Sequence, residues 1–187
     1  MARERSAQAG SFVHHLMGAA TFDAATYERI ETDPQASVWA AVTVLLASLA
    51  AGIGAGGWSG PTLGTVVGVT AIALVTWVAW AVMIFQIGTR VLPEPQTRAT
   101  LGELLRTTGF AAAPGLLQIF AAFPRVTIPV YLFTWLWMLA AMVVAVQHAL
   151  DYERTWRAIL VCVLAASLAV LLAFGIGLIW TPVVVAR

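Results

Sequence analysis

Long apolar stretches without charge alternate along the chain with short windows that hold almost every charged residue. Apart from Arg187, all charged residues lie within 3–33, within 90–106, at Arg125 or within 151–157. A helix needs about 20 apolar residues to cross the hydrocarbon core of a bilayer. The charge-free stretches therefore predict membrane spans at about 36–57, 62–88, 127–149 and 158–183, and an all-α fold, a polytopic membrane helix bundle.

The stretch 107–123 is the shortest apolar segment, at the lower length limit for a spanning helix. We predict that it crosses the membrane, which gives five transmembrane helices; the alternative is four helices plus a re-entrant segment. Pro114 would leave the backbone carbonyl near Phe110 without its helical donor, and Gln118 or a water is a candidate to satisfy it. Because an amide at mid-depth is costly, Gln118 is a functional candidate, or else it bridges helices.

Glycines mark the first turn between spans. The sequence Gly-Gly-Trp-Ser-Gly-Pro at 56–61 ends one helix and begins the next, which predicts a tight helical hairpin. Small residues four positions apart let helices approach closely. We assign these glycines to the contact between the first two helices, with an interface between copies of the chain as the alternative: Gly52, Gly56, Gly60, Gly64 and Gly68.

Residues 1–35 form a separate, more polar segment, cytosolic or interfacial, ahead of a membrane domain at 36–187. An apolar stripe on its first helix comprises Phe12, Val13, Leu16, Met17 and Ala20, with Ser11, His14, His15 and Gly18 on the other side. This helix is predicted to lie in the membrane interface, or alternatively to pack on the cytoplasmic loops.

A second short helix is predicted from about Ala24 to Thr32, capped by Asp23, with Tyr27 and Ile30 facing the membrane side. Asp33 and Pro34 follow it directly. They have the residue types of an N-cap and a first helical position, so a sharp turn is expected between the surface segment and the first span.

Composition narrows the class further. The chain has 187 residues, of which 60% are hydrophobic and 10% charged, and its mean hydropathy is +0.87. A soluble domain is about 25% charged, and a disordered chain is rich in charge and poor in apolar residues, so both classes are excluded. The net charge of +1 gives no electrostatic reason to expect a nucleic-acid partner.

Arginine placement orients the bundle. With five spans and the amino end inside, eight of the 10 basic residues lie on the inner side, which matches the positive-inside rule. The four-span alternative gives the same ratio and changes only the side of the carboxyl end. Trp77 and Trp80 lie too deep for an aromatic belt at the bilayer surface and are assigned to helix packing.

Candidate chemistry is sparse. Cys162 is a lone thiol in an apolar run, and His14 and His15 point about 100° apart on a helix, so no metal site is predicted. Gly57-Trp58-Ser59-Gly60 has the Gly-x-Ser-Gly pattern of rhomboid-type proteases. The three histidines are predicted on the opposite side of about 30 Å of hydrocarbon. We therefore predict no enzyme activity, no catalytic residues and no cofactor.

Several short motifs resemble one family over nearly the whole chain. They are Thr21-Phe22, Tyr27 and Ile30 leading into Asp33-Pro34; Gly52-Ile53-Gly54; Gly109-Phe110 followed by Pro114; and Ala149-Leu150-Asp151. This pattern resembles the bacterial branch of the Ypt-interacting protein (Yip) domain family. The resemblance implies five transmembrane helices, a cytosolic amino end and a non-enzymatic character. The role of eukaryotic relatives with Rab-type GTPases is not carried over, because their Asp-Leu-Tyr-Gly-Pro motif is absent.

Together these observations predict a non-catalytic multi-pass protein that organises membrane or partner proteins. The expected location is the inner membrane of a bacterial cell, with the amino end cytoplasmic. The expected partners are membrane lipids and either further copies of the chain or another membrane protein. The alternative function is a permeation unit for a small molecule, lipid or ion, since the glycine hairpin and the interrupted segment with Gln118 suit a cavity. The motif candidates are Asp33, Pro34, Gly109, Phe110, Pro114 and Gln118.

Overall fold

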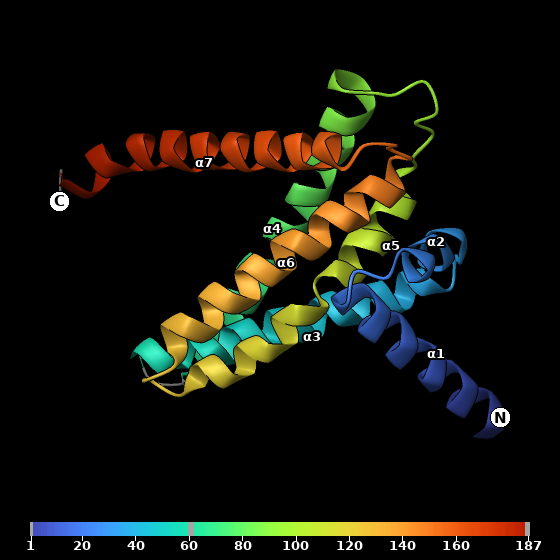
Figure 1. The fold of residues 1–187 in the computed structure, drawn as a ribbon. Coiled ribbons are helices and arrows are strands. Elements are labelled where there is room, and N and C mark those ends of the chain that lie inside the picture. Colours follow the sequence, from blue (N-terminus) through green and yellow to red (C-terminus); the bar gives the residue numbers. More distant parts are fainter. Residues whose placement is uncertain (1, 60–61, 186–187) are drawn as a thin grey trace.

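The computed structural model describes the backbone of residues 2–59 and 62–185 and the side chains of 10–56, 62–169 and 171. Within these ranges all regular structure is helical, which confirms the predicted fold class (Figure 1). The elements are α1 Ala2–Ala20, α2 Ala24–Thr32, α3 Ala36–Ser59, α4 Leu63–Gln86, η1 Ile87–Val91, α5 Leu101–Ala111, η2 Ala113–Ala122, α6 Thr127–Ala149 and α7 Thr155–Val185.

Three helical segments are long and apolar enough to cross a membrane: Ala36–Gly56, Leu63–Val91 and Thr127–Ala149. The first is most of α3, the second is α4 with the π-helical turn η1, and the third is α6, whose bounds are the predicted ones. The described part of α7 contributes a shorter apolar segment, Thr155–Ala169. The chain therefore builds its bundle from the segments that the charge-free pattern indicates.

The chain runs back and forth between two ends of the bundle (Figure 1). One end, which we call the charged end, gathers α2, the loop 92–100, the start of α5 and the turn 150–154. The opposite end holds the α3–α4 hairpin and the turn 123–126. Elements α5 and η2 together run from the charged end to the opposite end, and α6 returns beside them.

Helix α5 begins with a capping box and changes its geometry at Pro114. The Thr100 hydroxyl accepts from the Glu103 N–H at 3.2 Å, and the Glu103 carboxylate accepts from the Thr100 N–H at 2.7 Å. Pro114 lies in the first turn of η2, a 3₁₀ helix of 10 residues packed against α3 and α6. Since a 3₁₀ helix rises about 2.0 Å per residue and an α-helix about 1.5 Å, residues 107–122 extend about 28 Å.

The glycines of the first helical hairpin do not all serve the predicted contact between α3 and α4. A Cβ on Gly52 would lie 2.6 Å from the Val66 carbonyl oxygen, so Gly52 does allow α3 to approach α4. The prediction for Gly68 is wrong, because a Cβ there would meet no described atom within 4 Å. Among the described atoms a Cβ on Gly64 would meet only the Thr62 hydroxyl at 4.0 Å, and the side chains of 57–61 lie outside that set. Gly56 is buried, and Gly60 lies outside the described residues.

The amino-terminal helix packs on the bundle with a face that mixes apolar and polar residues. Phe12 stacks on Trp39 with ring centroids 4.8 Å apart, and His15 and Gly18, predicted on the polar side, are buried. Val13 and Met17 are exposed instead. The prediction that the apolar residues share one environment and the polar residues another is therefore wrong. Gly18 packs closely on Thr26, and in this orientation of α1 only part of the apolar stripe faces outward.

Two helices end in a left-handed residue that is not glycine. Phe22 (φ 64°) follows α1, and the Asp23 N–H donates back to the Gly18 carbonyl at 2.9 Å. Asp151 (φ 52°) follows α6 in the same way, with the Tyr152 N–H bonded to the Gln147 carbonyl at 2.9 Å. Both are Schellman caps, which turn the chain sharply at these two helix ends.

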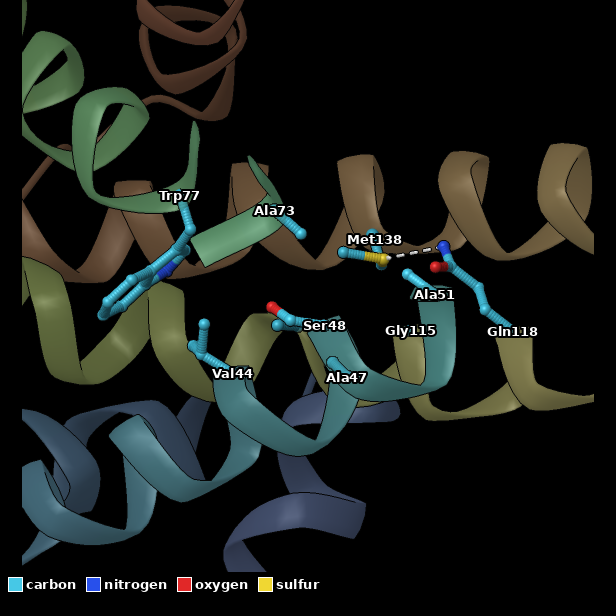
Figure 2. A pocket seen from close by; sticks show the side chains of 10 residues that line it. Val44, Ala47, Ser48, Ala51, Ala73, Trp77, Gly115, Gln118 and Met138 are labelled. Atoms are coloured by element: carbon cyan, nitrogen blue, oxygen red, sulfur yellow. Dashed lines mark hydrogen bonds between the residues drawn. The ribbon is translucent and has the colours of Figure 1, made fainter. Parts of the chain in front are cut away.

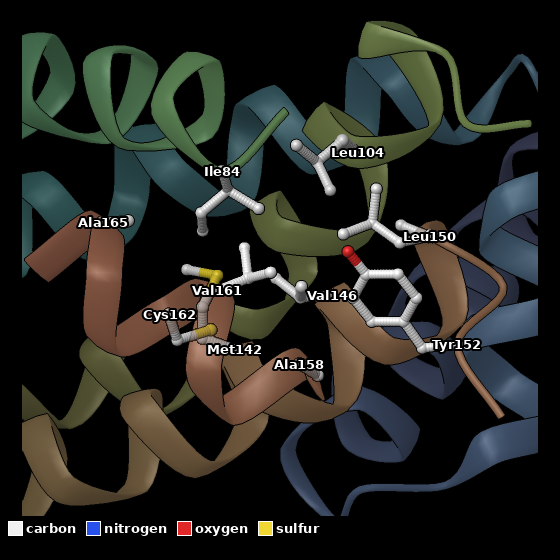
Figure 3. Close-up of a cluster of buried hydrophobic side chains, with 11 residues drawn as sticks. Ile84, Leu104, Met142, Val146, Leu150, Tyr152, Ala158, Val161, Cys162 and Ala165 are labelled. Atoms are coloured by element: carbon white, nitrogen blue, oxygen red, sulfur yellow. The ribbon is translucent and has the colours of Figure 1, made fainter. Parts of the chain in front are cut away.

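A buried apolar cluster fixes α7 to the charged end (Figure 3). It includes Ile84, Leu104, Val146, Leu150 and Val161. The Tyr152 hydroxyl lies 2.8 Å from the Leu92 carbonyl and 3.2 Å from the Gly88 carbonyl, and Arg157 pairs with Glu94 at 2.9 Å. Cys162 belongs to this cluster, as its apolar context predicts. Beyond it, α7 extends away from the other helices (Figure 1).

Candidate functional site

A cavity of about 100 Å³ lies at the middle of the bundle (Figure 2). Its walls come from the central turns of α3, α4 and α6 and from the junction of α5 with η2. The lining residues are Val44, Ala47, Ser48, Ala51, Ala73, Trp77, Ala112, Gly115, Gln118 and Met138. The cavity therefore lies in the central part of the membrane-length helices.

Small side chains make the room for this cavity. Five of the lining residues are alanine or glycine, at 47, 51, 73, 112 and 115. Gly115 sits tightly against its neighbours, since a Cβ there would lie 3.0 Å from Met138 Sδ and 3.2 Å from Ala47 Cβ. The helix backbones thus approach closely around a space that the alanine side chains leave unfilled.

Gln118 places its amide at one end of the cavity. The residue is only 7% exposed, and its Nε2 atom lies 3.8 Å from Met138 Sδ, a weak acceptor (Figure 2). The amide does not reach the Phe110 carbonyl, so that predicted contact is wrong. The Ala112 N–H donates to the Gly109 and Phe110 carbonyls instead, because the backbone tightens into the 3₁₀ helix there.

Trp77 lines the other end of the cavity. Its indole Nε1–H is buried and has no hydrogen-bond partner within the described part of the chain. The nitrogen lies on the side of the ring nearer Ser48 (Figure 2). A buried polar group without a partner costs about 1–3 kcal/mol. Sequence reasoning assigned Trp77 to packing; only its depth, away from the interfacial belt, signalled something else.

The cavity is lined by uncharged residues, three of which carry hydrogen-bonding side chains. No lining residue is charged. Trp77 offers a donor only, Ser48 a hydroxyl that both donates and accepts, and Gln118 two donors and an acceptor. The site can therefore hold hydrogen-bonding groups without compensating a charge.

The glycine and phenylalanine of the Gly-Phe-x-x-x-Pro motif lie outside this cavity, at the contact of α5 with α1–α3. A Cβ on Gly109 would lie 2.8 Å from Ala40 Cβ. Phe110 is fully buried and meets the His15 ring edge-on at 5.7 Å. Of the predicted motif residues, only Pro114 and Gln118 belong to η2, and only Gln118 lines the cavity.

Asp33 and Pro34 form the turn between α2 and α3. The Asp33 carboxylate accepts from the Gln35 N–H at 2.9 Å, and the Asp33 carbonyl accepts from the Ala36 N–H at 3.0 Å. The carboxylate bonds the N–H two residues on, as the predicted cap would, but regular helix begins at Ala36, two residues after the predicted first helical position Pro34. The pair directs the chain from the surface segment into the bundle.

Carboxylates gather around Glu31 at the charged end. Burial, followed by the negative charges of Asp151 and Glu103, raises the pKa of Glu31 from 4.5 to about 7, with Glu28 adding to the rise and Arg106 opposing it. Arg106 donates from Nη2 to the Glu31 carbonyl at 2.6 Å. Among the described residues, no three histidine, cysteine or acidic side chains are placed to hold a metal ion.

Comparison with known proteins gives one finding. The family model described as the Yip1 domain matches residues 17–177, which covers most of the chain, from the end of α1 into α7. No match was found among curated proteins or among solved structures.

Proposed function

The chain belongs to the Yip1 domain family, and from that premise we propose that it is a non-catalytic multi-pass membrane protein that organises the bilayer around it. We place it in the inner membrane of a bacterial cell with five spans and a cytoplasmic amino end. The passage of α5 and η2 from the charged end to the opposite end supports the fifth span, since their apolar part extends about 28 Å.

The observation behind the organising role is a hairpin of α1 and α2 anchored to a membrane-length helix. The Trp137 indole N–H donates to the Ala20 carbonyl at 2.7 Å. The Tyr27 hydroxyl lies 3.1 Å from the Ala19 carbonyl and 3.3 Å from the Ala141 carbonyl. These bonds hold the tip of the hairpin beside the middle of α6.

Apolar side chains on this hairpin remain uncovered. Val13 is 49% exposed, Met17 63% and Phe22 40%. An apolar helix surface beside a membrane span is suited to contact lipid acyl chains. Because α6 fixes the hairpin in place, its insertion would occupy area in one leaflet only and order the lipids there.

The test places a fluorescent bimane label on the full chain in nanodiscs, in a Cys162→Ala background. A label at Met17→Cys is expected to be quenched by lipids with nitroxides on their acyl chains. A label at Ser11→Cys, exposed on another face of α1, serves as the control and is expected to respond to aqueous iodide. If Met17 responds to iodide alone, the hairpin lies in water and the organising role fails.

A second candidate function, permeation of a small solute, is supported by the mid-bundle cavity alone. The cavity, at about 100 Å³, would have to widen for a solute to pass through the bundle. Flux into proteoliposomes is the measurement, with Gln118→Leu as the variant. Background flux in both the natural protein and the variant discards this function.

The partners that we propose are membrane lipids and further copies of the chain or another membrane protein. Gly68 supports the second of these, because a Cβ there would meet no described atom within 4 Å, which leaves this part of α4 open to close helix approach. Cross-linking of Gly68→Cys in membranes, compared with Gly10→Cys on α1, tests whether that face meets a second copy.

A further inference from the structure

The mid-bundle cavity leaves hydrogen-bonding groups unsatisfied at both of its ends. At one end the Trp77 N–H has no acceptor within the described chain, and at the other the Gln118 amide meets only a thioether at 3.8 Å. Buried polar groups in folded proteins nearly always have a partner. In a hydrocarbon environment no bulk water is at hand to supply one, so the cavity needs an occupant of its own.

Size and chemistry limit that occupant. A cavity of about 100 Å³ matches roughly three water molecules at about 30 Å³ each. The absence of charge on the lining residues disfavours an ion, because an isolated charge in such a place costs many kcal/mol. The buried Trp77 N–H, which has no acceptor within the described chain, favours a ligand that accepts hydrogen bonds. The alanine walls between Trp77 and Gln118 favour an apolar body.

We propose that this cavity is a binding site for a small uncharged molecule of about three or four non-hydrogen atoms that carries a hydrogen-bond-accepting oxygen. Its oxygen accepts from the Gln118 amide or the Trp77 indole, and its apolar part lies against Ala47, Ala51 and Ala73. Water fills the site when the ligand is absent. This site is separate from the exposed hairpin on which the organising role rests.

The experiment uses acetone as the probe and isobutene as its apolar isostere. The full chain in detergent carries 5-fluorotryptophan, and the Trp77 fluorine resonance is identified by its loss in Trp77→Phe. Acetone is expected to shift this resonance saturably. Its affinity relative to isobutene is expected to exceed the ratio of their partition from water into detergent by about threefold to tenfold, the contribution of one hydrogen bond. Gln118→Leu is expected to reduce this preference.

Two leucine substitutions on α4 separate the cavity from the micelle. Ala73→Leu fills the cavity and is expected to abolish saturable binding. Ala71→Leu adds the same side chain at an exposed position of the same helix and is expected to leave binding intact. If Ala73→Leu fails to fold, Ala51→Val fills the cavity from α3 instead.

Three outcomes would overturn the proposal. The first is a shift that rises linearly without saturation, because it reports partition into detergent. The second is a ratio of acetone to isobutene affinity in the natural protein that equals the ratio of their partition from water into detergent. The third is undiminished saturable binding in the cavity-filling variants. None of these outcomes affects the hairpin, whose lipid contact is tested separately by the bimane labels.

Discussion

At the residue scale, Gly109 of the Gly-Phe-x-x-x-Pro motif packs tightly against α3. A Cβ there would lie 2.8 Å from Ala40 Cβ and 3.3 Å from the Ala40 carbonyl oxygen, so α5 would have to move. We expect Gly109→Ala to destabilise the protein by about 1–3 kcal/mol, the usual range for overpacking. Unfolding in mixed micelles measures it. Gly68→Ala, with open space around it, is the control, and equal stability of the two variants would contradict the prediction.

The Glu31 carboxyl gives the protein a predictable response to pH. Its pKa is raised from 4.5 to about 7 in the folded chain, so between these values the folded state binds a proton that the unfolded state has lost. Stability from this group is therefore present at low pH and falls as the pH rises toward 7. We expect the melting temperature in detergent to decline over this window, and Glu31→Gln to flatten the decline. An unchanged slope in Glu31→Gln, matching that of the exposed-site control Glu153→Gln, would contradict it.

Some residue roles follow from sequence and others do not. The capping role of Asp33 was predictable because an Asp-Pro pair has one common use at a helix start. The left-handed residues Phe22 and Asp151 gave no such signal, since glycine is the usual residue there. The unpartnered indole N–H of Trp77 could not be predicted either, because whether a tryptophan finds an acceptor depends on neighbours distant in sequence.

At the element scale, the shortest hydrogen bond between the α1–α2 hairpin and α6 in the described chain comes from Trp137, and the Tyr27 hydroxyl adds a longer one to Ala141. Trp137→Phe removes the N–H that donates to the Ala20 carbonyl at 2.7 Å. We expect amide hydrogen exchange in residues 12–20 to rise about threefold to tenfold, the effect of one net hydrogen bond. Trp135→Phe changes an exposed tryptophan on the same helix and is expected to leave exchange unchanged. A rise of the same size in both variants would show that the indole does not anchor the hairpin.

The bounds of elements were predictable where composition changes sharply and were less so elsewhere. Helix α6 begins and ends at the predicted residues because arginine and aspartate windows flank it. The segment 107–123 is more complex, since Pro114 ends an α-helix and starts a long 3₁₀ helix that no periodic signal marks. Its extra rise per residue brings a stretch at the lower length limit to about 28 Å, close to the hydrocarbon thickness of about 30 Å.

At the scale of the whole molecule, the charged end is one connected structure. Arg106 joins α5 to the end of α2, Glu94 joins the loop 92–100 to Arg157 of α7, and Tyr152 bonds the carbonyls of Gly88 and Leu92. These contacts link segments far apart in sequence. The sequence predicted that these charges share one side of the membrane, and the structure adds which of them are partners.

The number of crossings decides which side of the membrane each turn occupies. Cysteines that replace two arginines and a glutamate would show it. Arg98, Arg125 and Glu153 are exposed, and Arg125 lies in the turn at the opposite end from the other two (Figure 1). With five spans, cysteines at 98 and 153 face the cytoplasm and one at 125 faces outward. With a re-entrant 107–123, residues 98 and 125 share the cytoplasmic side and 153 faces outward.

We expect the five-span pattern, because residues 107–122 extend about 28 Å, nearly the hydrocarbon thickness of about 30 Å. The measurement is labelling of single cysteines, in a Cys162→Ala background, by a membrane-impermeant maleimide in spheroplasts and in inverted vesicles. Arg125→Cys is expected to react in spheroplasts, and Arg98→Cys and Glu153→Cys only in inverted vesicles. Reaction of Glu153→Cys in spheroplasts together with protection of Arg125→Cys would replace the fifth span by a re-entrant segment. The cavity beside Gln118 would then sit in a bundle of four crossing helices.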